Sequence, residues 1–158
     1  MDLYEELIAL TEAFSVDEVP YALCGGLALA VHGFPRFTRD IDFLILPEDE
    51  PRALATARRQ QFVLEGGRVP EGSGQPRAPE IVRVSKVVGR DLLTLDLLLV
   101  NHTLDSVWST RREFEFNNRR LWVVSRAGLG TLKRLAGRKQ DLLDLETLGL
   151  SDDSEHEF

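Results

Sequence analysis

The sequence is poor in the residues that cross-link a protein or anchor it in a membrane. Cys24 is the only cysteine among 158 residues, so neither an internal disulfide nor a zinc site built from cysteines is available. No apolar run reaches the roughly 18 residues that a membrane-spanning helix needs. The first ten residues, MDLYEELIAL, are acidic where an export signal would be basic. We therefore expect a cytoplasmic protein with no membrane association.

Basic charge is also scarce. The chain has 19 Lys and Arg against 26 Asp and Glu, a formal net charge of −7, which argues against a strongly basic nucleic-acid binder. The charge is unevenly spread, because residues 1–31 hold six acids and no Lys or Arg, whereas residues 111–139 hold nine bases and two acids. Phosphate binding is one interpretation of this basic segment. A solvated surface that pairs with the acidic N-terminal helix is the favoured one.

Apolar periodicity and turn residues predict one α/β (α+β) domain over residues 1–150, with a mixed β-sheet and flanking helices. Its elements do not alternate strictly, which disfavours a doubly wound fold. Gly and Pro supply seven of the fifteen residues 65–79, so we expect a long flexible loop there. We expect the acidic tail, 151–158, to be disordered. The expected elements are helix 2–14, strand 21–24, helix 27–31, strand 41–46, helix 49–61, strands 80–88 and 92–100 around a turn at 89–91, helix 102–109, a hairpin around Asn117-Asn118, and helices 126–136 and 139–148.

Three aspartates are candidate metal ligands and catalytic residues. Asp40 and Asp42 are two residues apart at the start of an expected strand, where alternation puts both side chains on one face. Asp96 lies within an apolar strand, where an acid is costly to bury without a partner. Carboxylates brought together repel one another unless a cation neutralises them. Since carboxylate oxygens suit Mg²⁺ or Mn²⁺, the set predicts a two-metal site. Taken singly, each acid is more typical of a cap or a structural hydrogen bond.

A double glycine, Gly25-Gly26, lies between the first expected strand and the short helix after it. Residues without side chains let backbone N–H groups approach a phosphate closely. Carboxylates for metals together with a backbone cradle for phosphate indicate phosphoryl or nucleotidyl transfer.

These residues resemble the core motif of the DNA polymerase β-like nucleotidyltransferase superfamily. The motif is an apolar residue and two small ones, a spacer of about nine to thirteen residues, Asp-apolar-Asp-apolar, and a third acid on a later strand. The sequence has CGG at 24–26, thirteen spacer residues, DIDF at 40–43 and LDL at 95–97. The stretches GGLALAVHGFPRFTRDIDFLI and LKRLAGRKQDLLDLETL are also similar to small bacterial AbiEii-type nucleotidyltransferases. The resemblance covers roughly residues 20–46, 92–100 and 124–148.

The resemblance implies a minimal nucleotidyltransferase fold and a Mg²⁺-dependent transfer of a nucleoside monophosphate from a nucleoside triphosphate (NTP). By it, Asp40 and Asp42 would bind both metals, and Asp96 would ligate the catalytic metal and help to activate the acceptor hydroxyl. Gly25 and Gly26 would hold the triphosphate. The resemblance also implies that Lys133 neutralises phosphate charge, whereas its place on a helix beside apolar residues would make it an exposed side chain.

Other polar residues near these motifs have two interpretations. Arg36 and Arg39 flank the paired acids and fit either a triphosphate contact or an ion pair with a neighbouring acid. His32 fits packing or capping better than a role as a base.

Polar residues of the last two expected helices fit structural roles better than catalytic ones. Arg138 and Asp141 are expected to form a structural pair between the two helices. Asp141 and Asp144 are expected to be acids on a helix surface.

Three functions remain open. The first is an active nucleotidyltransferase acting on tRNA, another nucleic acid or a protein, in a context like that of toxin–antitoxin systems. The second is an antibiotic nucleotidyltransferase whose acceptor is a small molecule. The third is a non-catalytic nucleotide-binding or antitoxin-like module that works with a toxin or antitoxin partner protein. The presence of all three acids favours the first.

Overall fold

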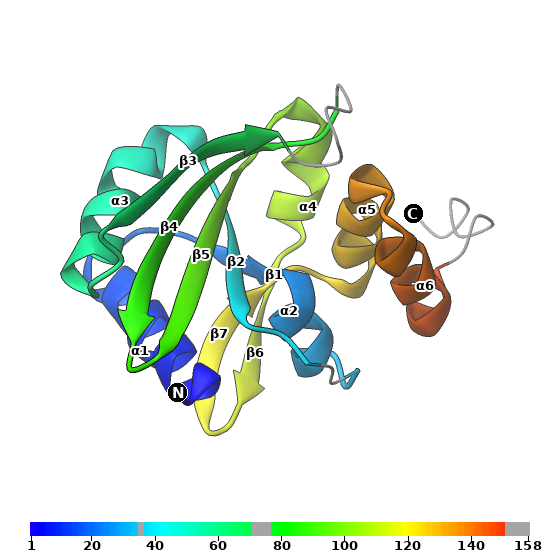
Figure 1. Cartoon of the computed structure of the whole chain (residues 1–158). Helices are drawn as coiled ribbons and strands as arrows, with labels where there is room; N and C mark the ends of the chain where they lie inside the picture. The colour runs from blue at the N-terminus through cyan, green and yellow to red at the C-terminus, as the bar shows by residue number, and fades with distance from the viewer. Residues whose placement is uncertain (35–36, 71–76, 151–158) are drawn as a thin grey trace.

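The computed structural model shows a mixed β-sheet with helices on both faces (Figure 1). It describes residues 1–34, 37–70 and 77–150. Within these residues the sheet has seven strands in the order β3-β4-β5-β2-β1-β7-β6. The strands are β1 (Ala22–Cys24), β2 (Asp40–Ile45), β3 (Leu64–Pro70), β4 (Glu80–Val88), β5 (Asp91–Leu99), β6 (Arg112–Phe116) and β7 (Arg119–Val123). The helices are α1 (Leu3–Val16), α2 (Gly25–Val31), α3 (Glu50–Arg59), α4 (Asp105–Ser109), α5 (Arg126–Ala136) and α6 (Lys139–Leu148), with 3₁₀ turns η1 (Pro47–Asp49) and η3 (His102–Leu104).

Strand directions combine hairpins with crossovers. β3, β4 and β5 form an antiparallel meander, and β6 and β7 form a hairpin. β2 pairs with β5 in parallel on one side and with β1 in antiparallel on the other, and β1 pairs in parallel with β7. The sheet is therefore mixed, as predicted, and β2 lies in its centre.

One face of the sheet carries the hydrophobic core. Alternate residues of β2 are fully buried there, namely Ile41, Phe43 and Ile45. The Phe43 ring stacks on Tyr21 with 4.7 Å between ring centroids, and Phe14 of α1 meets Phe43 edge-on at 5.1 Å. α1 and α3 cover this face, which lies behind the sheet in Figure 1. Burial of apolar surface is the dominant favourable term in folding. The residues that alternate with the acids of β2 therefore hold this strand in place.

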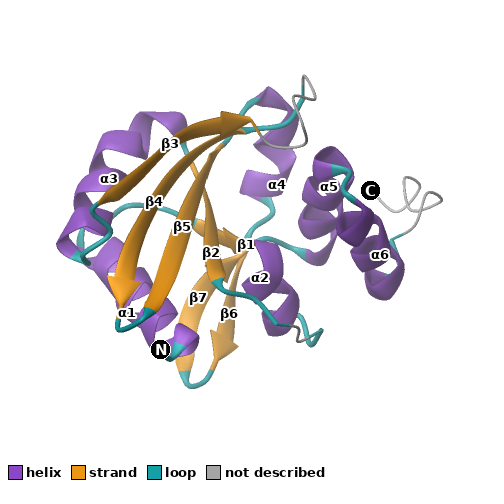
Figure 2. Cartoon of the chain, viewed as in Figure 1, coloured by secondary structure: helices purple, strands orange, loops and turns teal. Residues whose placement is uncertain are grey.

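The other face is more polar and only partly covered. α2, α5 and α6 lie together on the right of Figure 2, next to the middle of the sheet. Leu98 of β5 lines a small pocket with Leu129 and Leu132 of α5, so the far part of this face is apolar. The aspartates lie on the same face, nearer to the start of β2.

Most elements match the sequence-based predictions, and one does not. The prediction of a loop over residues 65–79 is wrong for its first part, because β3 pairs with β4 through residue 70. The two glycines that argued against a strand lie at an irregularity of this pairing, between Glu65 and Gly67. Residues 71–76 of the predicted loop and the predicted disordered tail 151–158 lie outside the described residues.

The ends of several elements follow from local chemistry. Asp2 caps α1 by accepting hydrogen bonds from the backbone N–H groups of Tyr4 and Glu5. The β6–β7 hairpin turns at Asn117 and Asn118, whose φ angles of 50° and 62° confirm the predicted left-handed turn.

None of the described helices is both long enough and apolar enough to cross a lipid bilayer. The basic segment 111–139 contacts the acidic N-terminal helix through an ion pair, Arg119 Nη1 to Glu12 Oε1 at 3.0 Å. Both of these side chains are more than half exposed, so the pair adds little stability.

Candidate functional site

The three predicted aspartates come together where β2 and β5 run side by side. Asp42 lies directly opposite Asp96 in this parallel pair, and Asp40 lies opposite Thr94. Burial increases across the group: Asp40 is exposed, Asp42 is half-buried and Asp96 is 6% exposed. The three carboxylates therefore lie at increasing depth, from the solvent-exposed Asp40 to the buried Asp96.

Gly25 is the residue that makes room for Asp42. Cys24, at the end of β1, is the register partner of Asp42, and Gly25 follows it as the first residue of α2. A Cβ at Gly25 would lie 2.1 Å from Oδ2 of Asp42, and the φ of Gly25 is +70°, which L side chains rarely adopt. Gly26 faces Thr38 in a similar way, since its Cβ would lie 3.0 Å from the Thr38 side chain. The double glycine thus brings backbone close to the acids.

Arg83 is a charged residue of the site that the sequence interpretation missed. It lies on β4 opposite Asp96. Its guanidinium donates from Nε to Oδ1 of Asp96 over 2.7 Å and from Nη2 to Oδ2 over 2.9 Å. This two-pronged geometry is the strong form of an ion pair. The hydrogen bond to Asp96, and then the charges of Asp96, Asp40 and Asp42, raise the pKa of Arg83.

Charge repulsion remains at Asp40. Partial burial raises the pKa of Asp40, the negative charge of Asp96 raises it further, and Arg83 opposes this in part. A raised carboxyl pKa means that the fold disfavours the ionised form. Partial desolvation and then the charge of Asp96 therefore both disfavour the ionised form of Asp40.

The donor set fits a divalent cation in kind, but Asp96 is engaged elsewhere. Among the described residues no three Asp, Glu, His or Cys side chains form a ready-made metal site. Asp40, Asp42 and Asp96 offer only carboxylate oxygens, which Mg²⁺ and Mn²⁺ prefer. Both oxygens of Asp96 accept hydrogen bonds from Arg83. A metal at Asp96 would therefore share these oxygens with Arg83 or displace it.

Lys133 lines a small pocket together with Gly25 and Asp42. The expectation of an exposed Lys133 is wrong, because the residue is 7% exposed. Its ammonium pairs with Asp141 at 3.3 Å and with Asp144 at 3.1 Å. These two acids were expected on the surface of the last helix, but they are buried as the partners of Lys133.

The remaining predicted residues have varied surroundings. Arg138 donates from Nε to Oδ2 of Asp141 over 2.7 Å, which confirms the expected pair, but the pair joins the N-cap of α6 to its own first turn and does not link the two helices. His32 lies 2.9 Å from the backbone oxygen of Val124 and edge-on to a phenylalanine ring, in line with a packing role. Arg39 is exposed and lies over the Phe37 ring, 5.4 Å from its centroid. Arg36 lies outside the described residues.

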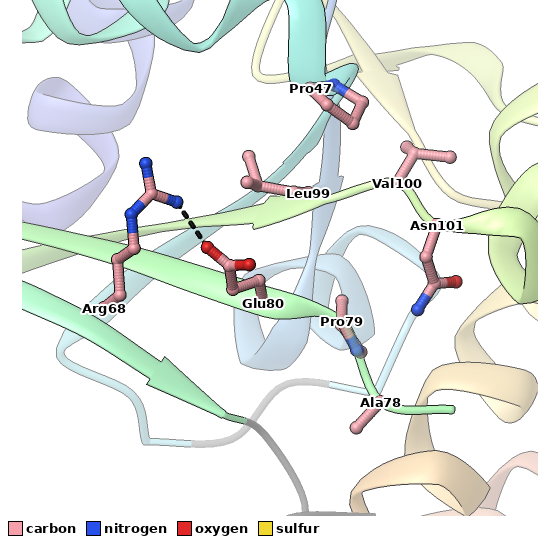
Figure 3. A pocket seen from close by; sticks show the side chains of 8 residues that line it. All are labelled: Pro47, Arg68, Ala78, Pro79, Glu80, Leu99, Val100 and Asn101. Carbon is pink, nitrogen blue, oxygen red and sulfur yellow. Dashed lines mark hydrogen bonds and ion pairs between the residues drawn. The ribbon is translucent and has the colours of Figure 1, made fainter. Parts of the chain in front are cut away.

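A separate cavity of about 470 Å³ opens near the far ends of β2 and β5 (Figure 3). Leu99, Val100 and two prolines form most of its apolar wall. Arg68 and Glu80 on its rim form an ion pair at 2.5 Å, and Arg68 also pairs with Glu50. None of the predicted site residues lines this cavity, so it gives no reason to move the chemistry away from the aspartates.

Comparison with known proteins identifies a family of nucleotidyl transferases. The family model described as "Nucleotidyl transferase AbiEii toxin, Type IV TA system" matches residues 8–122, more than half of the 158-residue chain. No curated protein matches the sequence.

Several solved structures share the fold. A protein from Thermotoga maritima assigned as a nucleotidyltransferase has a TM-score of 0.60 at 13% identity, over 92% of this chain and 91% of that one. The antibiotic-resistance factor ANT(2'')-Ia has a TM-score of 0.53 at 14% identity, over 99% of this chain and 95% of that one. JHP933 from Helicobacter pylori has a TM-score of 0.52 at 16% identity over 92% of this chain, which spans only 63% of the JHP933 chain.

Replacing Asp40 by Asn should make the protein slightly more stable at pH 7. The raised pKa of Asp40 means that the folded state favours the neutral form, which Asn imitates. Because Asp40 is exposed and water screens it, the gain should be small, roughly 0.5 kcal/mol in urea unfolding. The gain should shrink as the pH falls through the raised pKa of Asp40 and should be gone below the ordinary pKa of an aspartate, where Asp40 is neutral in both states. Glu115→Gln, at an exposed acid of β6, is the control and should show no such gain. A loss of stability in Asp40→Asn at pH 7 would contradict the repulsion.

Replacing Lys133 by Met should lower the free energy of unfolding by about 3 kcal/mol, because it removes the buried ammonium that Asp141 and Asp144 share. Adding Asp144→Asn to this variant should restore part of the loss. Lys139→Met, at an exposed lysine of α6, is the matched control and should change stability little. A fully stable Lys133→Met variant would mean that the buried pairing is unimportant.

Proposed function

We propose, from the premise that this chain belongs to the AbiEii family of nucleotidyl transferases, that it moves a nucleoside monophosphate from an NTP to an acceptor hydroxyl with the help of Mg²⁺ or Mn²⁺. Asp40, Asp42 and Asp96 would be the metal ligands. The observation that carries the proposal is the register of β2 and β5, with Asp42 opposite Asp96.

The register of β2 and β5 matters because it brings the carboxylate oxygens of Asp42 and Asp96 to the same place in the sheet. A single acid beside Arg83 would be an ordinary ion pair. Asp40 and Asp42 lie on the same face, and the pKa of Asp40 is raised by partial burial and then by the negative charge of Asp96. Proteins keep such unfavourable charge where function needs it. Bound divalent cations would neutralise this charge and the phosphates, and would make the acceptor hydroxyl a better nucleophile.

The chain's own residues would orient the NTP around these acids. Gly25 and Gly26 leave their backbone open beside Asp42, where a phosphate can approach. Lys133 lines the same pocket and would supply positive charge to the triphosphate. Its pairing with Asp141 and Asp144 would hold the ammonium in a fixed place.

Asp96 would take up the proton of the acceptor hydroxyl while the acceptor oxygen bonds to the α-phosphorus and pyrophosphate leaves. Its deep position on β5 suits this role, since a buried base is shielded from bulk water. Arg39 is exposed near the start of β2 and is proposed to contact the triphosphate. Arg36 is proposed to do the same.

The test is label transfer from each of the four NTPs, labelled at the α-phosphate, to total RNA, to a protein extract and to a panel of aminoglycosides. With Mg²⁺ we expect label in one macromolecular pool and none with a γ-phosphate label, since the monophosphate is what moves. Asp42→Asn and Asp96→Asn should each lower the rate at least 100-fold, because each removes a charged ligand from the transition state.

The controls separate the competing functions. Glu80→Gln, an acid of the distant cavity, should transfer label at the wild-type rate. Label on an aminoglycoside alone would identify a small-molecule enzyme, a class in keeping with the fold shared with the antibiotic-resistance factor ANT(2'')-Ia. Binding of NTP without transfer to any pool would leave a nucleotide-binding module and would refute the enzyme.

We further propose that the activity is toxic and is held in check by a partner, on the ground of the family description as a toxin of a type IV toxin–antitoxin system. Induced expression of the wild-type chain in a bacterium should slow growth by at least twofold. Asp42→Asn, expressed to the same level, should not slow it. Equal growth of the two cultures in several hosts would contradict the toxin role.

A further inference from the structure

The Arg83–Asp96 pair occupies the two oxygen atoms that a metal would need. Asp96 is the most buried of the three aspartates, and its side chain is 8% exposed while that of Arg83 is 43% exposed. Water reaches the guanidinium more easily than the carboxylate. Separating the pair therefore leaves the arginine in solvent and the acid in need of another cation.

Gly66 determines where the Arg83 side chain runs. A Cβ at Gly66 would lie 2.7 Å from Cγ and 3.0 Å from Cδ of Arg83, so the aliphatic stem of the arginine crosses β3 over this glycine. The crossing lies at the irregularity of the β3–β4 pairing, between Glu65 and Gly67. Gly66 has no positive φ that would demand glycine for its backbone. Its need is for space, and the occupant of that space is Arg83.

We propose that Gly66 and Arg83 form a positioning device for Asp96, in which Arg83 holds the carboxylate in the metal-free protein and competes with the divalent cation for its oxygens. This rests on the proposed function, because it takes Asp96 as a metal ligand. Arg83 is a positioning residue that acts through Asp96. A metal and the two-pronged ion pair draw on the same two oxygens, so each weakens the other. The metal affinity of the site therefore depends partly on residues of β3 and β4.

Exchange of partners keeps the charge of Asp96 compensated throughout. Burying the Asp96 carboxylate without a cation costs free energy, and in the metal-free protein the guanidinium of Arg83 is that cation. Arg83 needs no replacement partner when it is displaced, since its side chain is already 43% exposed to solvent.

The test is Mn²⁺ binding to the purified full chain, measured by calorimetry and by the loss of the electron paramagnetic resonance signal of free Mn²⁺. Arg83→Met should bind Mn²⁺ roughly tenfold more tightly than wild type, since one charge-assisted competitor is removed. Gly66→Ala should tighten binding in the same direction although Arg83 is still present, because the added methyl displaces the arginine stem. Adding Gly66→Ala to Arg83→Met should change nothing further.

Two more variants complete the design. Arg83→Lys keeps the charge but lacks the two-pronged geometry, and it should lie between wild type and Arg83→Met. Arg68→Met removes a β3 arginine that pairs with Glu50 and Glu80, and it should bind Mn²⁺ as wild type does. If Arg83→Met does not fold, Gly66→Ala and Arg83→Lys carry the same comparison.

The outcomes separate this inference from the proposed function. Unchanged or weaker Mn²⁺ binding in both Arg83→Met and Gly66→Ala, with wild-type binding abolished by Asp42→Asn, overturns the positioning device and leaves the metal site intact. No Mn²⁺ binding by wild type or any variant overturns both. A tighter but additive effect of the two substitutions would show that Gly66 does not act through Arg83.

Discussion

Asp42 and Asp96 lie opposite each other on parallel strands, and two carboxylates at that spacing repel. The fold can hold this arrangement only because the other face of the same strands is strongly apolar. Ile41 and Phe43 are fully buried beside the acids, so slipping the register by one residue would expose this core. The same alternation that buries the core therefore forces the acids together, and every other charge of the site responds to that constraint.

The two nearest cations of the site illustrate two ways of meeting a buried acid. Arg83 approaches from a neighbouring strand, is partly exposed and binds one carboxylate with two hydrogen bonds. Lys133 comes from a helix, is buried, and lies between the two carboxylates of Asp141 and Asp144. The first arrangement can open without burying an unpaired charge on the arginine. The second cannot open cheaply, so Lys133 is a fixed positive charge and Arg83 is an exchangeable one.

The sequence was sufficient to predict the helices and most strands, and it placed the three aspartates on strands that prove to be neighbours, because those features depend on local periodicity and on motif order. It was not sufficient for the partners of these acids. With the turn predicted at 89–91, Val84 would face Asp96, whereas the observed two-residue turn at 89–90 places Arg83 there. One residue of turn length decides which face a strand side chain occupies, and periodicity does not resolve turn length.

The glycines of residues 65–70 led to a wrong prediction of a loop, and the reason is physical. A strand rich in glycine is unfavourable by propensity, so the start of residues 65–79 was predicted as a loop. At Gly66 that cost is offset by a neighbour, since only glycine leaves room for the stem of Arg83. The same holds for Gly25, which leaves room for Asp42. In both places, one in strand β3 and one at the start of helix α2, the missing side chain creates space for a charged one, so the two glycines are tied to the placement of the acids.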